Sequence, residues 1–321
     1  MEQEVVKHKI VKYSKFEKRD FFFAYALVAF PILQFLVFWV YVNASSIFLA
    51  FQTETGEFTL LNFKAVFSSF TKLDTFGLDF GKSLQNSMTL WVINHLVCFP
   101  VTVVTTYILQ RKIWGHYLWR VCYIIPSLMG SVVWTSLVKY MVSYDGLIVN
   151  ALVSIGMELP EMVLRNGLFA AEETAFPTLI TITTIMGFVG NNAVLTGAYS
   201  RVPDEIFESA KLDGAGFWRE FISIAVPCVW PTLATLMTFG LCGIFTADAN
   251  VFLYSNGTGK PGMSTVGFHL YYITYQISMR GASNSAFGYP AAIGFTLTMM
   301  TLPIVLIGRW ALEKMQEAVE L

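Results

Sequence analysis

Charged residues are scarce in this sequence. Only 13% of the 321 residues are charged and 55% are hydrophobic, whereas soluble domains carry a charge on roughly a quarter of their residues. This scarcity excludes an ordinary water-soluble domain and places the chain in lipid. The formal net charge is only −1, and we expect no nucleic-acid partner.

Cysteine and histidine are sparse as well. No set of cysteine, histidine and glutamate residues at ligand spacing is large enough to form a metal site, so none is predicted. His95 lies in an apolar run and is interpreted as a packing residue. The cysteines also fall inside apolar runs, which predicts small buried side chains and no disulfide framework. They are Cys98, Cys122, Cys228 and Cys242.

Motifs for chemistry are missing too. Gly259-Lys260 is followed by Pro261 where a P-loop requires Ser or Thr, and Tyr254 occupies the position of its first glycine. No nucleophile and base constellation is evident. The chain is therefore predicted to catalyse no reaction, to bind no ATP or Mg²⁺ itself, and to need no cofactor.

Long apolar intervals are what the sequence does contain. A helix needs about 20 apolar residues to cross a bilayer, so the apolar stretches at 146–157 and 261–279, which are too short or too polar, are placed outside it. We predict an all-α membrane protein with about six transmembrane helices. The charge-free intervals that predict them are 21–53, 83–110, 121–138, 174–200, 221–247 and 281–308.

The distribution of basic residues predicts the topology. Of the 21 Lys and Arg residues, 14 lie in the first 20 residues or follow the second, fourth and sixth intervals. By the positive-inside rule, both termini are cytoplasmic. We expect a cytoplasmic tail at 1–20 and one transmembrane domain at 21–321. The first apolar interval is too long for a signal-peptide core and is interpreted as a retained span.

The segment 203–214 carries the start and stop signals of a short surface helix. Pro203 suits the first helical position, acidic residues follow it, and Gly214 can adopt a left-handed cap. With five charged side chains it cannot cross lipid. A second helix is expected to begin near Phe217. Such a segment is by itself a capped surface loop, so its function depends on a further signal.

That signal is the spacing of five residues. They match the pattern E-A-A, three residues, G, nine residues, I, one residue, L-P, at Glu208, Ala210, Gly214, Ile224 and Pro227. The chain thus resembles the permeases of ABC importers, whose EAA signature has this form. Ser209 and Val226 are mild departures from it. The stretch Asp213-Gly214-Ala215 is similar to the carbohydrate branch of the family.

The resemblance implies a type I ABC importer permease fold in a bacterial inner membrane. Segment 203–214 would be the coupling helix that docks into a cytoplasmic ATPase, with Glu208, Ser209, Ala210 and Asp213 near the contact and Gly214 making the turn. The implied partners are a second, related permease subunit in a heterodimer, two ATP-binding cassette subunits that carry ATP and Mg²⁺, an extracytoplasmic solute-binding protein, a carbohydrate substrate and membrane lipid.

A weaker resemblance concerns the subunit type. Maltose-type permeases carry a Gly-Gly-Pro loop followed by Ser-Thr after the fifth span. The matching positions here are Gly259, Pro261, Ser264 and Thr265, whereas Lys260 replaces the second glycine. This pattern favours the maltose-type half of the heterodimer.

Polar groups at membrane depth are candidates for a sugar path. Asn191 and Asn192 lie inside the fourth interval, and an amide both donates to and accepts from sugar hydroxyls. Interhelical hydrogen bonding explains the same residues equally well. A second group lies near the outer end of the fifth interval, where an aromatic belt is the alternative explanation. It comprises Asp248, Asn250, Phe252 and Tyr254.

Two other transport functions stay open. The same importer type could carry another solute such as a polyamine or phosphate, although the intervals show neither the carboxylates nor the arginines that such solutes require. A secondary transporter is disfavoured because the chain lacks two equivalent hydrophobic halves and contains the docking segment.

Overall fold

The computed structural model describes residues 15–319, with gaps at 54, 74–78, 112–114, 258–261 and 282–283. The described residues form helices, together with one isolated bridge between Gln52 and Phe58. The predicted all-α class is therefore confirmed. The positions Gly259, Lys260 and Pro261, on which the P-loop and Gly-Gly-Pro comparisons rest, lie outside the described residues.

The helices follow one another with short connections. Up to residue 166 they are α1 (Lys15–Phe35), η1 (Leu36–Tyr41), α2 (Val42–Ala50), α3 (Leu61–Ser69), α4 (Phe80–Val92), η2 (Ile93–Cys98), α5 (Phe99–Gln110), α6 (His116–Leu128), α7 (Ser131–Met141), α8 (Leu147–Ser154) and α9 (Glu161–Asn166). The others are α10 (Glu172–Val189), α11 (Asn192–Tyr199), α12 (Asp204–Leu212), α13 (Phe217–Glu220), η3 (Phe221–Ala225), α14 (Val226–Cys242), α15 (Val251–Tyr254), α16 (Val266–Met279), η4 (Asn284–Phe287) and α17 (Gly288–Val319). Segments η1, η2 and η3 are π-helical and η4 is a 3₁₀ turn.

Five continuous helical stretches in the described part of the chain are long and apolar enough to cross a membrane. A sixth candidate is the pair α6 and α7, whose axes differ by 97°. The predicted interval 121–138 therefore contains a bend, because Gly130 is extended at the break and Pro126 lacks an amide donor. The five stretches are Phe21–Ala50, Phe80–Gln110, Glu172–Tyr199, Phe217–Cys242 and Gly288–Met315.

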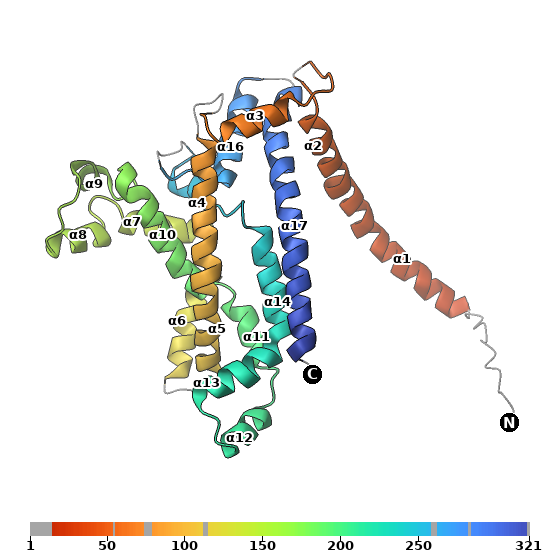
Figure 1. The fold of residues 1–321 in the computed structure, drawn as a ribbon, viewed down its shortest axis with the longest axis vertical. Coiled ribbons are helices and arrows are strands. Elements are labelled where there is room, and N and C mark those ends of the chain that lie inside the picture. Colours follow the sequence, from red (N-terminus) through yellow and green to blue (C-terminus); the bar gives the residue numbers. More distant parts are fainter. Residues whose placement is uncertain are drawn as a thin grey trace.

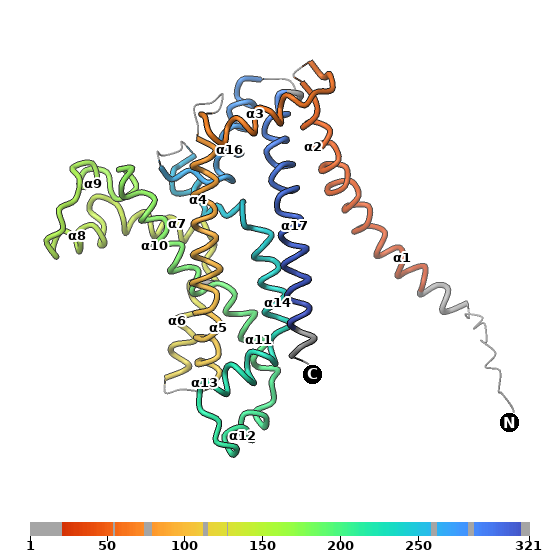
Figure 2. The backbone as a smooth tube through the Cα atoms, viewed as in Figure 1, coloured from red at the N-terminus to blue at the C-terminus, as the bar shows by residue number. Residues whose placement is uncertain are grey.

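The spans form a bundle with α12 at one end and α3 and α16 at the other (Figure 1). Helix α14 packs along α17, and α5 packs against α10 and α11. The helix that begins at Lys15, inside the predicted tail, diverges from this bundle (Figure 2). In the most apolar 18-residue window of Phe21–Ala50, no residue is buried. The apolar side chains on all sides of this part of the helix therefore face outward.

Outward-facing apolar surface also explains why the predicted burial of the four cysteines is only partly right. Cys98 is buried as expected, but Cys122, Cys228 and Cys242 are exposed. An apolar run in a membrane span has a face that meets lipid, so hydrophobicity there does not predict burial inside the protein. The predicted packing role of His95 agrees with its position, because its ring stacks on Trp91 with centroids 5.0 Å apart.

One buried cluster lies at the α12 end of the bundle. It joins side chains from α5, α11, α12 and α14, so the base of the short helix α12 is part of the core rather than a loop beside it. Its buried members are Val103, Tyr107, Leu195, Ala198, Tyr199, Phe207, Phe221, Ala225, Val229 and Leu233.

Candidate functional site

Helix α12 occupies the segment in which the sequence predicts a docking helix. Pro203 is its N-cap, so the helix begins one residue later than predicted. Gly214 adopts φ +75°. Its amide donates to the Lys211 carbonyl at 3.0 Å, and the Ala215 amide donates to the Ala210 carbonyl at 2.9 Å. This is the hydrogen-bond pattern of a Schellman cap, so the predicted left-handed stop is confirmed.

The two faces of α12 have opposite character. Phe207 and Ala210 are buried against the bundle, whereas Glu208 and Ser209 are exposed. Leu212, at the last turn, is 89% exposed. The capped helix of nine residues projects from the end of the bundle (Figure 1). Its outward surface is mostly polar. This surface is available to another protein.

The base of α12 rests on a polar and aromatic cluster that sequence reasoning missed. The Phe207 ring lies under the Arg111 guanidinium, 4.8 Å from ring centroid to the guanidinium carbon. Glu220 accepts hydrogen bonds from Tyr107 Oη at 2.6 Å and from Arg111 Nη2 at 2.7 Å. The available signal was a single carboxylate immediately before the fifth apolar interval and an arginine immediately after the second.

A π-helical turn connects this cluster to the next span. Segment η3 follows Glu220 directly and leads into α14, where Pro227 lies in the first turn. Ile224 is half-buried and packs against the same cluster as Phe207. The signature positions Ile224 and Pro227 therefore lie where the docking segment becomes the membrane span.

Asn191 and Asn192 lie at a break between α10 and α11. Asn191 has φ 58° and is exposed. Asn192 is buried, and its Oδ1 accepts hydrogen bonds from Thr106 at 3.2 Å and Thr196 at 3.0 Å. The neighbouring amides thus differ: one joins α11 to α5, and the other is free to meet solvent or a ligand at the break.

The second predicted group divides in the same way. Asn250 and Phe252 are exposed, and Phe252 makes an edge contact with Tyr271 at 4.6 Å between centroids. Asp248 accepts a hydrogen bond from Thr265 at 2.6 Å, and Tyr254 is buried against Phe169. Asp248 and Tyr254 therefore shape the loop after α14.

The two groups come from different regions of the bundle. Tyr254 shares a buried cluster with Ala175 and Leu179 near the start of α10, whereas Asn191 follows the end of that helix. The structure of the single chain therefore separates the two sets along α10 and does not gather them into one pocket.

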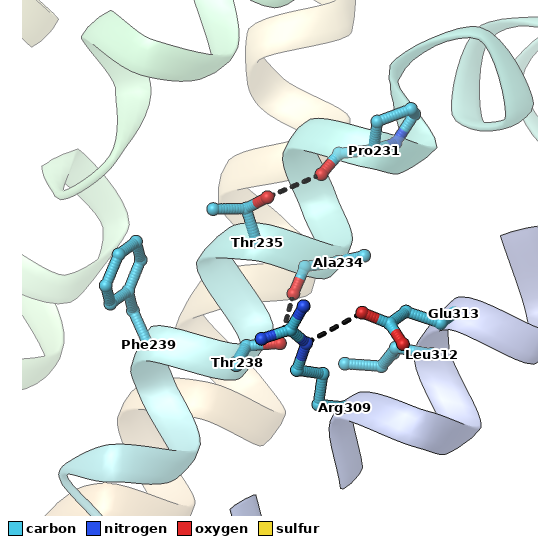
Figure 3. A pocket seen from close by; sticks show the side chains of 8 residues that line it. All are labelled: Pro231, Ala234, Thr235, Thr238, Phe239, Arg309, Leu312 and Glu313. Carbon is cyan, nitrogen blue, oxygen red and sulfur yellow. Dashed lines mark hydrogen bonds and ion pairs between the residues drawn. The ribbon is translucent and has the colours of Figure 1, made fainter. Parts of the chain in front are cut away.

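Two cavities in the described part of the chain frame the α12 end. One of about 200 Å³ lies beside Phe207, Tyr107 and Arg111. The other, of about 380 Å³, lies between α14 and α17 and contains none of the predicted site residues (Figure 3). Thr235 and Thr238 in its wall donate to carbonyls of their own helix. The described residues contain no group of three or more His, Cys, Asp or Glu side chains that could hold a metal.

The bundle of spans and the exposed capped helix are the architecture of a multi-pass membrane protein. No family model matches the chain. The lactose transport system permease LacF of Rhizobium radiobacter is 25% identical over 223 residues, 69% of this chain and 72% of LacF. The arabinooligosaccharides permease AraP of Bacillus subtilis (strain 168) is 25% identical over 302 residues, 90% of each chain.

Solved structures show the same fold. A bacterial ABC transporter that imports alginate superposes with a TM-score of 0.71 at 21% identity, covering 92% of this chain and 96% of that one. A second structure, of the alginate transporter with its alginate pentasaccharide-bound periplasmic protein, gives 0.69 at 21% identity, covering 91% and 93%. This chain is thus similar to the binding-protein-dependent permeases of ABC importers, in agreement with the resemblance found in its sequence. Both named relatives are permease proteins of transport systems.

Proposed function

We propose that this permease forms half of the path for an oligosaccharide and is driven through α12 by a cytoplasmic ATPase. The observation that carries the proposal is the projecting helix α12, ended by the left-handed cap at Gly214. The residues from Glu208 to Pro227 have the spacing of the EAA signature. LacF and AraP are named for lactose and arabino-oligosaccharides, and both names favour a short sugar chain as the solute.

In this proposal α12 enters a cleft of an ATP-binding cassette subunit. Glu208, Ser209 and Asp213 are exposed on the helix and its cap, where they can hydrogen-bond to the partner, and Leu212 supplies an apolar contact. A helix that packs against the bundle on one side and binds the ATP-binding cassette subunit on the other acts as a rigid lever. ATP and Mg²⁺ are held by the partner, and this chain supplies the movement of its spans.

The proposed assembly has four further components. A second, related permease completes the path, two ATP-binding cassette subunits lie on the α12 side, and a solute-binding protein docks on the opposite side. The solved alginate importer includes such a periplasmic protein. The outward apolar surface of Phe21–Ala50 suits lipid and the second permease. The distribution of basic residues favours a cytoplasmic position for both termini and α12, and we propose residues 1–20 as a tail on the domain 21–321.

The proposed sugar contacts come from the exposed members of the predicted groups. Asn191 and Asn250 offer amides that donate and accept, and Phe252 offers an aromatic face for a pyranose ring. Their neighbours hold the local backbone in place: Asn192 through its threonine partners, Asp248 through Thr265 and Tyr254 through Phe169.

The test is to purify the chain with its co-transcribed ATPase and binding protein and to reconstitute them in liposomes. Glu208→Ala removes a docking side chain, and Gly214→Pro removes the cap. We expect both variants to lose ATPase binding and uptake. Gly214→Asn is the matched control, because asparagine also adopts the left-handed conformation. ATPase binding and uptake that are unchanged in both disruptive variants would contradict the docking role.

The same liposomes identify the solute class. Lactose, arabino-oligosaccharide, alginate oligosaccharide, spermidine and phosphate are offered in turn as radiolabelled probes. We expect ATP-dependent uptake of at least one sugar and of neither non-sugar. Uptake of spermidine or phosphate alone would show that the solute is not a sugar. Uptake driven by an ion gradient without ATP would show that the protein is a secondary transporter and not part of an ABC importer.

A further inference from the structure

A buried ion pair joins two segments that are 109 positions apart in the sequence. Glu220, the last residue of α13, is only 3% exposed. Its carboxylate meets Arg111, the residue that follows α5, and the hydroxyl of Tyr107 on α5 itself. A buried carboxylate stays charged only when it is paired and hydrogen-bonded. The pair therefore fixes the start of the fifth span against the end of the second.

The same arginine also touches the docking helix. Its guanidinium lies over the ring of Phe207, the buried anchor of α12. The Tyr107 ring is 6.3 Å from Phe207 and 5.1 Å from Phe221, centroid to centroid. Arg111 and Tyr107 thus each contact both Glu220 of α13 and Phe207 of α12, and Arg111 supplies the positive charge of the pair.

The surroundings allow movement on both sides of the pair. The π-helical turn η3 begins immediately after Glu220, and such turns are points where helices kink and are frequent at functional sites. The cavity of about 200 Å³ beside Phe207 and Arg111 leaves space next to the anchor. Replacing a buried ion pair by apolar residues is often neutral for stability, so fixing one arrangement is the better-attested role.

We propose that Arg111 and Glu220 form a coupling link that makes the end of α5, the base of α12 and the start of α14 move as one body. This inference rests on the proposed function and adds to it the positioning residues within this chain. When the ATPase displaces α12, the link carries the displacement into two spans. Without the link, α12 moves alone and ATP is hydrolysed without transport.

The first test compares uptake with ATP hydrolysis in the reconstituted importer. Glu220→Gln keeps the shape and the Tyr107 hydrogen bond but removes the charge, and Arg111→Lys keeps the charge but loses the planar fork. Using the sugar that wild type imports, we expect sugar imported per ATP to fall roughly tenfold in Glu220→Gln and less in Arg111→Lys. ATPase subunit binding is expected to stay unchanged. A wild-type ratio in both variants would overturn the link.

The control is the exposed ion pair on α17. Arg309 Nε donates to Glu313 Oε1 at 2.7 Å, and both side chains are more than half exposed. Glu313→Gln therefore removes a pair of similar geometry that connects no separate helices. Its transport ratio is expected to match wild type, and a loss equal to that of Glu220→Gln would show that the effect is not specific to the buried pair.

A distance measurement separates linkage from stability. Spin labels at Leu212→Cys on α12 and Leu96→Cys on the second span, both exposed, are placed in a chain whose native cysteines are serine. We expect the distance between the labels to be equal in nucleotide-free and vanadate-trapped wild type and to change in Glu220→Gln and in Arg111→Lys. A distance that changes in wild type, or in neither variant, would overturn the link. Failure of wild type to bind an ATPase at all would instead overturn the proposed function.

Discussion

Helices α1 and α12 both project from the bundle (Figure 1), and they are built for different surroundings. In the first span, Phe21–Ala50, no residue of the most apolar window is buried, and its helices lack a polar face. Helix α12 carries two acidic residues in its first turn, a basic residue in its last and one buried aromatic anchor. The first helix suits lipid and an apolar subunit, whereas the second suits water and a protein cleft.

The largest effect is expected on membrane insertion, when positively charged side chains are introduced into the first span. Leu33→Lys with Leu36→Lys places two ammonium groups near the centre of Phe21–Ala50, which disfavours insertion by about 6 kcal/mol in total. The measurement is the fraction of chain integrated in the membrane, read by alkaline extraction and glycosylation mapping. The matched control is Ile206→Lys with Leu212→Lys on α12, which leaves integration unchanged. Equal loss in both pairs would remove the distinction between the helices.

The next effect concerns the anchor of α12. Phe207→Ala removes a buried ring that packs on Tyr107 and under Arg111, and large-to-small changes of this kind cost about 3 kcal/mol. We expect a lower unfolding temperature of the detergent-solubilised chain and weaker ATPase binding. Phe217→Ala is the comparison, because Phe217 also contacts Tyr107 but is exposed. A larger loss in Phe217→Ala would mean that α12 is not anchored through Phe207.

The smallest effect concerns the cap. A Cβ added at Gly214 meets no atom within 4 Å, so only the left-handed backbone opposes a side chain there. Gly214→Ala is expected to cost about 1 kcal/mol, and Gly214→Asn clearly less. Urea titration of proteolysis at the α12 turn measures the difference. Equal protection of both variants would show that the cap conformation does not stabilise α12.

Local patterns predicted the parts of the molecule that local physics controls. Gly214 forms the expected cap because a Schellman motif depends on residues within one helical turn. The apolar intervals became spans because twenty consecutive apolar residues have few other solutions in a bilayer. The bend within the interval 121–138 was not predicted, and it arises because Gly130, at its centre, breaks the helix.

The candidate site was predicted only where it is local. Glu208 and Ser209 are exposed on α12 as a docking helix requires, whereas Asn192 and Tyr254 are buried by partners that the sequence does not name. Their neighbours Asn191 and Phe252 are exposed. Adjacent residues of similar chemistry thus take different roles, because each role depends on which helix packs against that position.

The sequence by itself determined the membrane class, the position and caps of α12, and the spacing that relates this chain to ABC importer permeases. All of these depend on composition or on residues within about twenty positions of one another. Only the tertiary structure decided that Arg111 pairs with Glu220, that Phe207 lies beneath that pair and that three of the four cysteines face outward. Contacts between distant segments arise from how the spans pack, and local sequence patterns do not predict that packing.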